Sequence, residues 1–213
     1  MQFKICILMI EVIIKGLIIG LFISVPLGPI GMLCIQRTLN HGRKYGIATG
    51  LGATTSDLIY TLITLFFLSF VLDIIEQNKY IIQLSGSIIL IAFGLFIFRS
   101  HPANQPKPNE RIKFSILSDY FTSFGLTLSN PLVLFVLIAL FARFEFMTDI
   151  KSSLQYVIGI LSILVGALIW WSTLTFLVNK FKQKLNRRDL KRINQTTGII
   201  IVLIGIIGIL YTL

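Results

Sequence analysis

Long apolar segments recur along almost the whole chain, separated by short polar stretches. Six of them are long enough to cross a membrane, because about 20 apolar residues in a helix span the hydrocarbon core of a bilayer. They run over about Val12 to Leu33, Gly46 to Phe70, Tyr80 to Phe98, Tyr120 to Phe141, Leu154 to Val178 and Thr196 to Leu213. The pattern predicts an all-α integral membrane protein with six transmembrane helices. Short connections make residues 1–213 a single transmembrane domain.

One acidic residue, Asp57, interrupts the second apolar segment near its middle. A charge at the centre of a bilayer costs roughly 2.5 to 3.5 kcal/mol on insertion scales, so it usually faces a cavity or a partner. Small and polar residues share its helical face. They are Gly50, Thr54, Tyr60, Thr61 and Thr64. This stripe predicts the wall of a pathway through the membrane.

The two halves of the sequence resemble each other. The third span begins with the pattern Q-x-[ST]-G-x-I-I-[LV] at Gln83, and the same pattern returns at Gln195 in the sixth span. A serine also precedes Pro26 and Pro131 by two residues in the first and fourth spans. Chance similarity between isoleucine-rich helices is the alternative to a true repeat.

Three spans in each half would place the second copy upside down relative to the first. We therefore predict two inverted three-helix repeats, a common plan of secondary transporters. The first repeat covers about residues 12–98 and the second about residues 120–213. The proline-rich stretch 99–113 between them is predicted to be a cytoplasmic linker.

Prolines inside the first and fourth spans predict that these helices are broken. Pro26 and Pro29 lack an N–H, so the carbonyls four residues earlier lose their helical partners. Pro131 does the same in the fourth span, where Asn130 offers both a donor and an acceptor. Discontinuous helices at matching positions of two repeats point to a binding site at the membrane midplane. A kinked packing helix is the alternative at each proline site.

Small residues also repeat four apart along the first span, at Gly16, Gly20, Ser24 and Gly28. Such spacing favours a close contact with a neighbouring helix rather than a ligand site.

Composition and charge fit a membrane protein and set its orientation. Of 213 residues, 55% are hydrophobic and 13% charged. Fourteen of the 19 basic residues fall in three alternate loops, at 34–45, 99–119 and 179–195. Because cytoplasmic loops carry the excess of Lys and Arg, these loops are predicted to be cytoplasmic and both termini outside. The basic balance thus indicates contact with anionic lipid rather than nucleic acid, with a partner-binding patch after the fifth span as the alternative.

Cysteine and histidine offer no redox or metal chemistry at the spacings that such chemistry needs. Cys6 and Cys34 form no C-x-x-C pair, and both are expected to be packing residues. His41 and His101 are expected on loop surfaces, without a ligand neighbour at helical spacing. We therefore predict no metal site and no cofactor.

Several of these residues, in this order, resemble the lysine exporter (LysE/RhtB) family. The first half carries Gly28-Pro29-Ile30-Gly31, Arg37, Gly42-Arg43, Gly46, Gly50-Leu51-Gly52 and Asp57. The second half carries Asn130-Pro131, Gly166 to Trp170, and Ile193-Asn194 to Gly198. The resemblance covers nearly the whole chain.

What the resemblance implies is export of amino acids or similar small zwitterions from the cytoplasm, driven by the proton gradient, in a bacterial inner membrane. A zwitterion needs an anion for its ammonium and donors for its carboxylate. Asp57 can supply the first, and the half-helix N-terminus at Gly28, Pro29, Ile30 and Gly31 the second. Asp57 is also the candidate for proton coupling. The remaining candidate substrate-binding residues are Thr54, Tyr60, Thr61, Asn130 and Pro131.

Two other classes of function stay open at this point. A metal-ion exporter of the same superfamily would need several carboxylate, His or Cys ligands at membrane depth, where the predicted spans place Asp57 alone. An intramembrane enzyme or scaffold would be a different class, but the sequence has no paired acids, no nucleophile beside a His and no HExxH motif. We expect no enzymatic activity. A homo-oligomer is compatible with the sequence.

Overall fold

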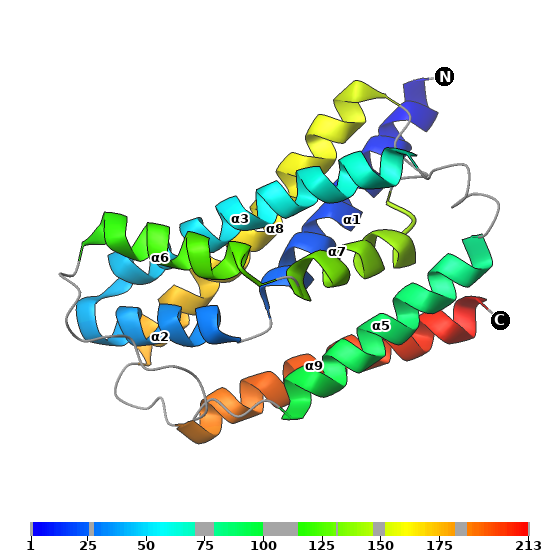
Figure 1. Cartoon of the computed structure of the whole chain (residues 1–213). Coiled ribbons are helices and arrows are strands. Elements are labelled where there is room, and N and C mark those ends of the chain that lie inside the picture. Colours follow the sequence, from blue (N-terminus) through cyan, green and yellow to red (C-terminus); the bar gives the residue numbers. More distant parts are fainter. Residues whose placement is uncertain are drawn as a thin grey trace.

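The computed structural model of the chain describes residues 2–25, 28–70, 79–99, 115–130, 132–146, 152–181 and 187–212. Within these ranges the fold is entirely helical. The helices are α1 Gln2–Ser24, α2 Pro29–His41, α3 Arg43–Phe70, α5 Lys79–Arg99, α6 Ile116–Leu128, α7 Leu132–Arg143, α8 Ser153–Lys180 and α9 Arg187–Thr212 (Figure 1).

Four of these helices are each long and apolar enough to cross a membrane. In two further cases, a bent pair of helices is long and apolar enough when its two members are counted as one span. The single helices are α3, α5, α8 and α9, over Arg43–Phe67, Tyr80–Arg99, Ser153–Lys180 and Gln195–Thr212. Helices α1 and α2 meet at 78°, and α6 and α7 meet at 68°. The chain therefore has four candidate spans, or six if each bent pair is one span. The predicted breaks in the first and fourth apolar segments are confirmed by these bends.

Several helix ends differ from those expected from hydropathy. The segment 34–45, expected to be a loop, is helical except at Gly42, which ends α2 with a φ of 100°. Helices α6 and α9 likewise begin inside the segments expected to be loops, at Ile116 and Arg187. The expected helices were too short because a helix can continue through polar residues, whose backbones form the same hydrogen bonds as those of apolar residues.

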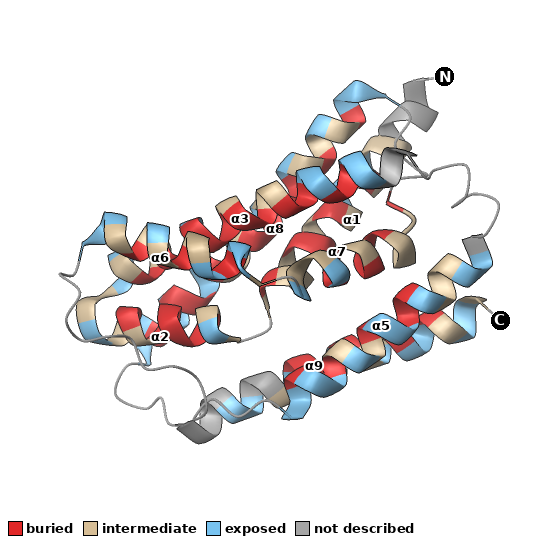
Figure 2. Cartoon of the chain, in the orientation of Figure 1, coloured by how far each residue is buried: buried red, intermediate tan, exposed pale blue. Residues whose placement is uncertain are grey.

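The helices pack in a pattern that places α3 at the centre of one side. Helix α3 packs against α2, α6 and α8, while α1 packs along α8 and α5 along both α9 and α7. Figure 1 shows α5 and α9 lying side by side, with the described ends of α1 and α9 at the same end of the molecule. In Figure 2 the buried residues concentrate on α2, α3 and α8, and exposed positions follow the outer faces of α5 and α9.

Those outer faces are apolar, as lipid contact requires. Phe96 of α5 is 60% exposed and Leu210 of α9 is 70% exposed, and many other large apolar side chains are exposed. Contiguous exposure of this kind is rare on soluble proteins. Together with the candidate spans, it describes a multi-pass membrane protein.

Glycines allow α1 and α8 to touch backbone to backbone. A Cβ at Gly20 would collide with the carbonyl oxygen of Ile163, and one at Gly166 would collide with that of Leu17. The predicted helix contact is thus confirmed for Gly16 and Gly20 but wrong for Gly28, where a Cβ would meet no atom within 4 Å. Gly28 differs because it lies beyond the end of α1, at the break.

Replacing Gly20 by Ala is expected to destabilise the protein by about 1–3 kcal/mol, since the added methyl group overpacks a backbone contact. The matched variant Gly125→Ala adds the same group to α6 where nothing lies within 4 Å, so it should leave stability unchanged or raise it by up to about 1 kcal/mol through helix propensity. Thermal unfolding of both purified variants in detergent measures the difference. Equal midpoints would contradict the tight α1–α8 contact.

Candidate functional site

The centre of the site is Asp57, which lies on α3 with 4% of its surface exposed. No cation pairs with its carboxyl group within the described part of the chain. Ser24, the last residue of α1, lies beside this carboxyl group. The Ser24 Oγ nevertheless makes no hydrogen bond of standard geometry to any described residue. The Asp57 carboxyl group therefore lies beside the end of α1, where the first helix break begins.

Tyr60, one turn after Asp57, meets the second helix break. Its hydroxyl donates to the carbonyl oxygen of Leu128 at 2.5 Å and lies 3.3 Å from that of Asn130. Asn130 in turn accepts a hydrogen bond at its Oδ1 from the backbone N–H of Leu132, at the start of α7. Side chains thus satisfy backbone groups that the break would otherwise leave unpaired. One helix, α3, connects the two breaks.

The N-cap residue of α2 is Gly28, which has no side chain to cap the backbone donors of the first turn. Pro29 is the first helical residue. Helix α2 runs back along the start of α3, with Cys34 Sγ donating to the carbonyl oxygen of Gly46. This course brings Ile30 into the same apolar cluster as Ala53 of α3, one turn before Asp57.

The predicted polar stripe of α3 faces the protein interior. Thr54, Tyr60, Thr61 and Thr64 are buried like Asp57. Thr54 and Thr64 donate to carbonyls of their own helix, whereas Thr61 Oγ1 is buried without a hydrogen-bond partner among the described residues.

The other predicted site residues differ in their surroundings. Gly31 is buried, Gly28 and Ile30 are half-buried and Pro29 is exposed. Asn130 is half-buried, with its Oδ1 engaged by α7. Pro131 lies outside the described residues.

Several buried polar atoms on α1, α3, α6 and α8 have no hydrogen-bond partner among the described residues. Such atoms are uncommon in folded proteins, and each calls for an explanation such as a ligand, an ion or water. In the described chain they are Ser24 Oγ, Thr61 Oγ1, Asp119 Oδ2, Thr127 Oγ1, Trp170 Nε1 and Trp171 Nε1. Sequence reasoning did not place Ser24, Asp119, Thr127 or the two tryptophans among the site residues.

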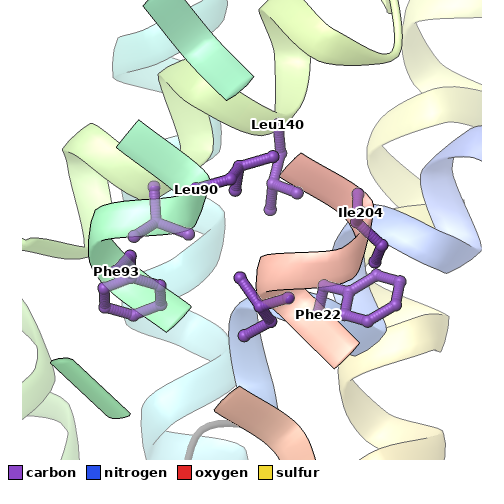
Figure 3. Close-up of a pocket in the computed structure, with 7 residues that line it drawn as sticks. Phe22, Leu90, Phe93, Leu140 and Ile204 are labelled. Carbon is purple, nitrogen blue, oxygen red and sulfur yellow. The ribbon is translucent and has the colours of Figure 1, made fainter. Parts of the chain in front are cut away.

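A small cavity elsewhere in the bundle is not a site for a polar ligand. It has a volume of about 10 Å³, room for about one water. Apolar side chains of α1, α5, α7 and α9 line it (Figure 3): Phe22, Leu90, Phe93, Val136, Leu140, Ile201 and Ile204.

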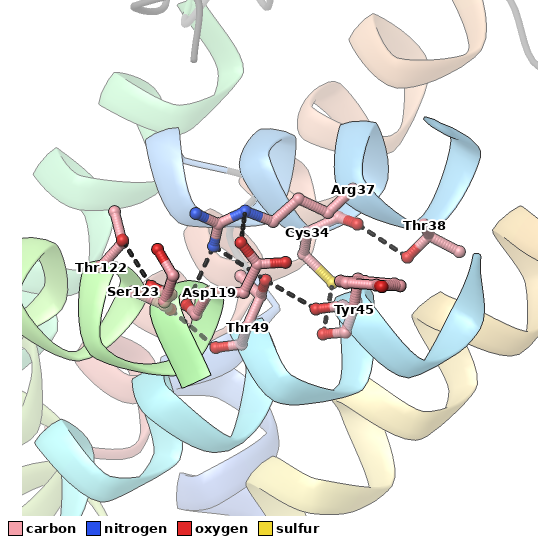
Figure 4. Close-up of polar contacts among 10 residues, drawn as sticks. Cys34, Arg37, Thr38, Tyr45, Thr49, Asp119, Thr122 and Ser123 are labelled. Atoms are coloured by element: carbon pink, nitrogen blue, oxygen red, sulfur yellow. Dashed lines mark hydrogen bonds and ion pairs between the residues drawn. The ribbon is translucent and has the colours of Figure 1, made fainter. Parts of the chain in front are cut away.

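A buried ion pair between α2 and α6 is a further polar centre that the sequence reasoning missed. The Nε of Arg37 lies 3.0 Å from Oδ1 of Asp119, and the two side chains are 10% and 5% exposed. One guanidinium nitrogen, Nη1, also donates to Thr49 Oγ1 at 3.0 Å and to the carbonyl oxygen of Asp119 at 2.9 Å. Figure 4 shows Arg37 reaching from α2 over α3 to Asp119.

Arg37 was expected to be a loop residue that sets orientation, and this interpretation is corrected. Arg37 lies inside α2 and is buried by its contacts with α3 and α6. The acid at position 119 gave a signal of the same kind as Asp57, a single acid beside a long apolar run. It was missed because the expected span began one residue later, at Tyr120.

Hydrogen bonds connect α3 to α6 along the whole contact between them. From the Arg37 end, Ser123 Oγ donates to the carbonyl oxygen of Thr49 at 2.6 Å and Ser56 Oγ to that of Phe124 at 2.7 Å. The Tyr60–Leu128 bond closes the series at the helix break. We call this contact the α3–α6 seam. Its hydrogen bonds run from the end near the ion pair to the break after Leu128.

Potential metal ligands do not cluster in the described part of the chain. No group of three or more His, Cys, Asp or Glu side chains there has the spacing to hold a metal ion.

Comparison with known proteins gives one family and one curated relative. A family model described as LysE type translocator matches residues 21–211, a range that includes both helix breaks. The "Putative amino acid efflux protein YcgF" of Bacillus subtilis (strain 168) is 24% identical over 196 residues, which cover 92% of this chain and 93% of that protein. No solved structure matches the chain.

Replacing Tyr60 by Phe is expected to lower stability by about 1 kcal/mol or more, since the carbonyl groups of Leu128 and Asn130 lose a buried donor. Tyr120→Phe is the matched control, because the Tyr120 hydroxyl bonds the hydroxyl of the half-buried Thr55 rather than a helix break. Thermal unfolding in detergent compares the two variants. A loss no larger for Tyr60→Phe than for the control would show that Tyr60 does not hold the break.

Proposed function

Since the chain belongs to the LysE type translocator family, whose members are transporters, we propose that it exports amino acids or related small zwitterions from the cytoplasm by proton antiport. The observation that carries the proposal is Asp57, a buried carboxyl group at mid-span without a cation partner in the described chain. An unpaired charge at this depth is costly and marks a functional site. The relative's printed name, an amino acid efflux protein, agrees with export.

The substrate's two charges find complementary groups around the two breaks. Its ammonium group pairs with the Asp57 carboxylate, and the unpartnered hydroxyls of Ser24 and Thr61 accept further ammonium hydrogens. Its carboxylate faces the uncapped N-terminus of α2, where backbone N–H groups and the helix dipole favour negative charge. Asn130 contributes its amide nitrogen, because its Oδ1 is already used by Leu132.

Burial also makes Asp57 the proton carrier. A carboxylate in a site of low dielectric constant is costly unless a cation or a proton neutralises it. The ammonium of an incoming substrate neutralises it in one half of the cycle, and a proton does so in the other. Because the two compete for one carboxylate, each export event returns a proton to the cytoplasm.

Alternating access follows from an inverted-repeat arrangement in the inner membrane. Each half of the chain contributes a bent pair, a long helix and a shorter partner: α1–α2, α3 and α5, then α6–α7, α8 and α9. Two pairs of contacts support this relation. The α1–α8 contact corresponds to the α6–α3 contact, and the α3–α7 contact corresponds to the α8–α2 contact, whereas the α2–α3 and α5–α7 contacts have no counterpart of similar extent among the described residues. Asp57 is 4% exposed, so we expect export to require the two halves to move relative to each other.

Replacing Asp57 by Asn is expected to reduce proton-coupled export to background while the protein stays folded, because a neutral amide is cheaper to bury. The measurement is export of labelled amino acids and the accompanying pH change in proteoliposomes. Glu11→Gln is the matched control, since it removes one carboxylate from a partly exposed pair with Lys15 on the protein surface. Near-normal proton-coupled transport by Asp57→Asn would leave Asp57 with a structural role only.

Membrane orientation provides a separate prediction. The basic loops predict that cysteines introduced at His41, Asn104 and Lys184 react with an impermeant reagent from the cytoplasm, and one at Leu213 from outside. Labelling of intact cells and of inverted vesicles measures this. Cytoplasmic labelling of Leu213 would contradict either the six-span count or the orientation.

A further inference from the structure

We propose that Arg37 and Asp119 form a second binding site, the cytoplasmic entry site for a zwitterion, in which the substrate replaces each residue as the partner of the other. The substrate carboxylate takes the Arg37 guanidinium and its ammonium takes the Asp119 carboxylate. This inference rests on the proposed function, because it assumes a substrate that carries both charges.

The pair joins the two halves of the chain at one end of the seam. Arg37 lies on α2 and Asp119 at the start of α6, 82 residues apart in sequence. Apart from this pair, α2 and α6 have little contact, since each packs mainly on α3. Both helix ends border the loops predicted to be cytoplasmic. Separating the pair would therefore free the facing ends of α2 and α6 from each other while both helices stay packed on α3.

The pair has unused binding capacity that points to a ligand. Asp119 Oδ2 is buried and has no hydrogen-bond partner among the described residues, although the other carboxylate oxygen faces Arg37. A carboxylate left half-satisfied inside a protein favours any donor that reaches it. An ammonium group supplies three such donors. Arg37 is held in position by Thr49 as well as by Asp119, so its guanidinium stays ordered when Asp119 changes partner.

A zwitterion suits this pair better than a simple ion does. A ligand with only one charge would pair with one of the residues and leave the other buried and unpaired, which is strongly unfavourable. A zwitterion pairs with both residues, and each of its own charges leaves water only to contact an opposite charge. The ion pair therefore selects for substrates that carry both charges before they reach Asp57.

The α3–α6 seam, the counterpart of the α1–α8 contact in the proposed repeat, has exchangeable hydrogen bonds in addition to close packing. Glycine packs against backbone in both contacts, since a Cβ at Gly20 would collide with Ile163 of α8 and one at Gly52 with the carbonyl oxygen of Tyr120 of α6. The α3–α6 seam also has the hydroxyl groups of Ser56 and Ser123 bonded to carbonyls of the opposite helix. Hydroxyl–carbonyl bonds can be exchanged for bonds to water or substrate. In our proposal the substrate follows these groups from Arg37 and Asp119 to Asp57.

Three probes with different charges test the site in the purified full-length protein. They are the L-amino acid that gives the largest thermal stabilisation among the proteinogenic set, its carboxamide, which lacks the negative charge, and its N-acetyl derivative, which lacks the positive charge. Affinities from thermal shifts give two ratios. The carboxylate ratio is the affinity for the amino acid divided by that for its carboxamide, and the ammonium ratio is the affinity for the amino acid divided by that for its N-acetyl derivative. We expect Arg37→Gln to reduce the carboxylate ratio roughly tenfold and to leave the ammonium ratio unchanged. Asp119→Asn is expected to reduce the ammonium ratio by a similar factor and to leave the carboxylate ratio unchanged.

Other variants separate a binding role from a structural one. Tyr120→Phe, in the same seam but without charge, should keep both ratios. If a single variant does not give folded protein, Arg37→Gln combined with Asp119→Asn leaves no lone charge and should fold, with both ratios reduced. Ratios unchanged from wild type in the charge variants, with amino acid binding intact, would overturn the entry site alone. A wild-type protein that no amino acid stabilises would overturn the proposed function and the entry site together.

Discussion

The burial of a charged group in a helix that has to cross hydrocarbon is the constraint on which the rest of this structure depends. Asp57 cannot face lipid, because the cost would be several kcal/mol, so α3 must turn its polar stripe inward. That places Thr54, Tyr60 and Thr61 inside as well, and it requires neighbours that can tolerate polar side chains. The neighbours are the ends of two broken helices, which bring backbone polar groups of their own.

The breaks and the stripe satisfy each other. A break inside a membrane exposes backbone donors and acceptors that lipid cannot bond, so they survive only where protein or a cavity meets them. At the second break the Tyr60 hydroxyl meets the carbonyl of Leu128, and Asn130 caps α7. At the first break Ser24 lies beside Asp57, but its hydroxyl has no hydrogen bond of standard geometry among the described residues, and the N-cap residue of α2 is a glycine. The first break is thus the one where we propose that ligand groups bind.

Polarity distinguishes two helix contacts that are otherwise packed alike. Glycines bring backbones close in both, through Gly20 in the α1–α8 contact and Gly52 in the α3–α6 seam. The α3–α6 seam has in addition hydrogen bonds between the helices and an ion pair at one end, whose partners can be exchanged. Under the proposed entry site, these are the bonds that a zwitterionic substrate replaces.

The sequence by itself predicted the long apolar helices, the places where two of them break and the acid that lies among them. These features follow from local rules: hydrophobic length, the missing N–H of proline, and the cost of an isolated charge. They predicted the inward stripe at Thr54, Tyr60 and Thr61 and the bends beside Pro29 and Asn130.

Only the tertiary structure decided the partners. The Arg37–Asp119 pair joins residues 82 positions apart, and hydropathy assigned Arg37 to a loop. Nor could spacing tell that Gly20 is packed against a backbone while Gly28 has open space, or that the Oδ1 of Asn130 is used by α7. Contacts between helices depend on how whole helices are rotated and crossed, which is set by the sum of many packing contacts rather than by the residues of any one segment.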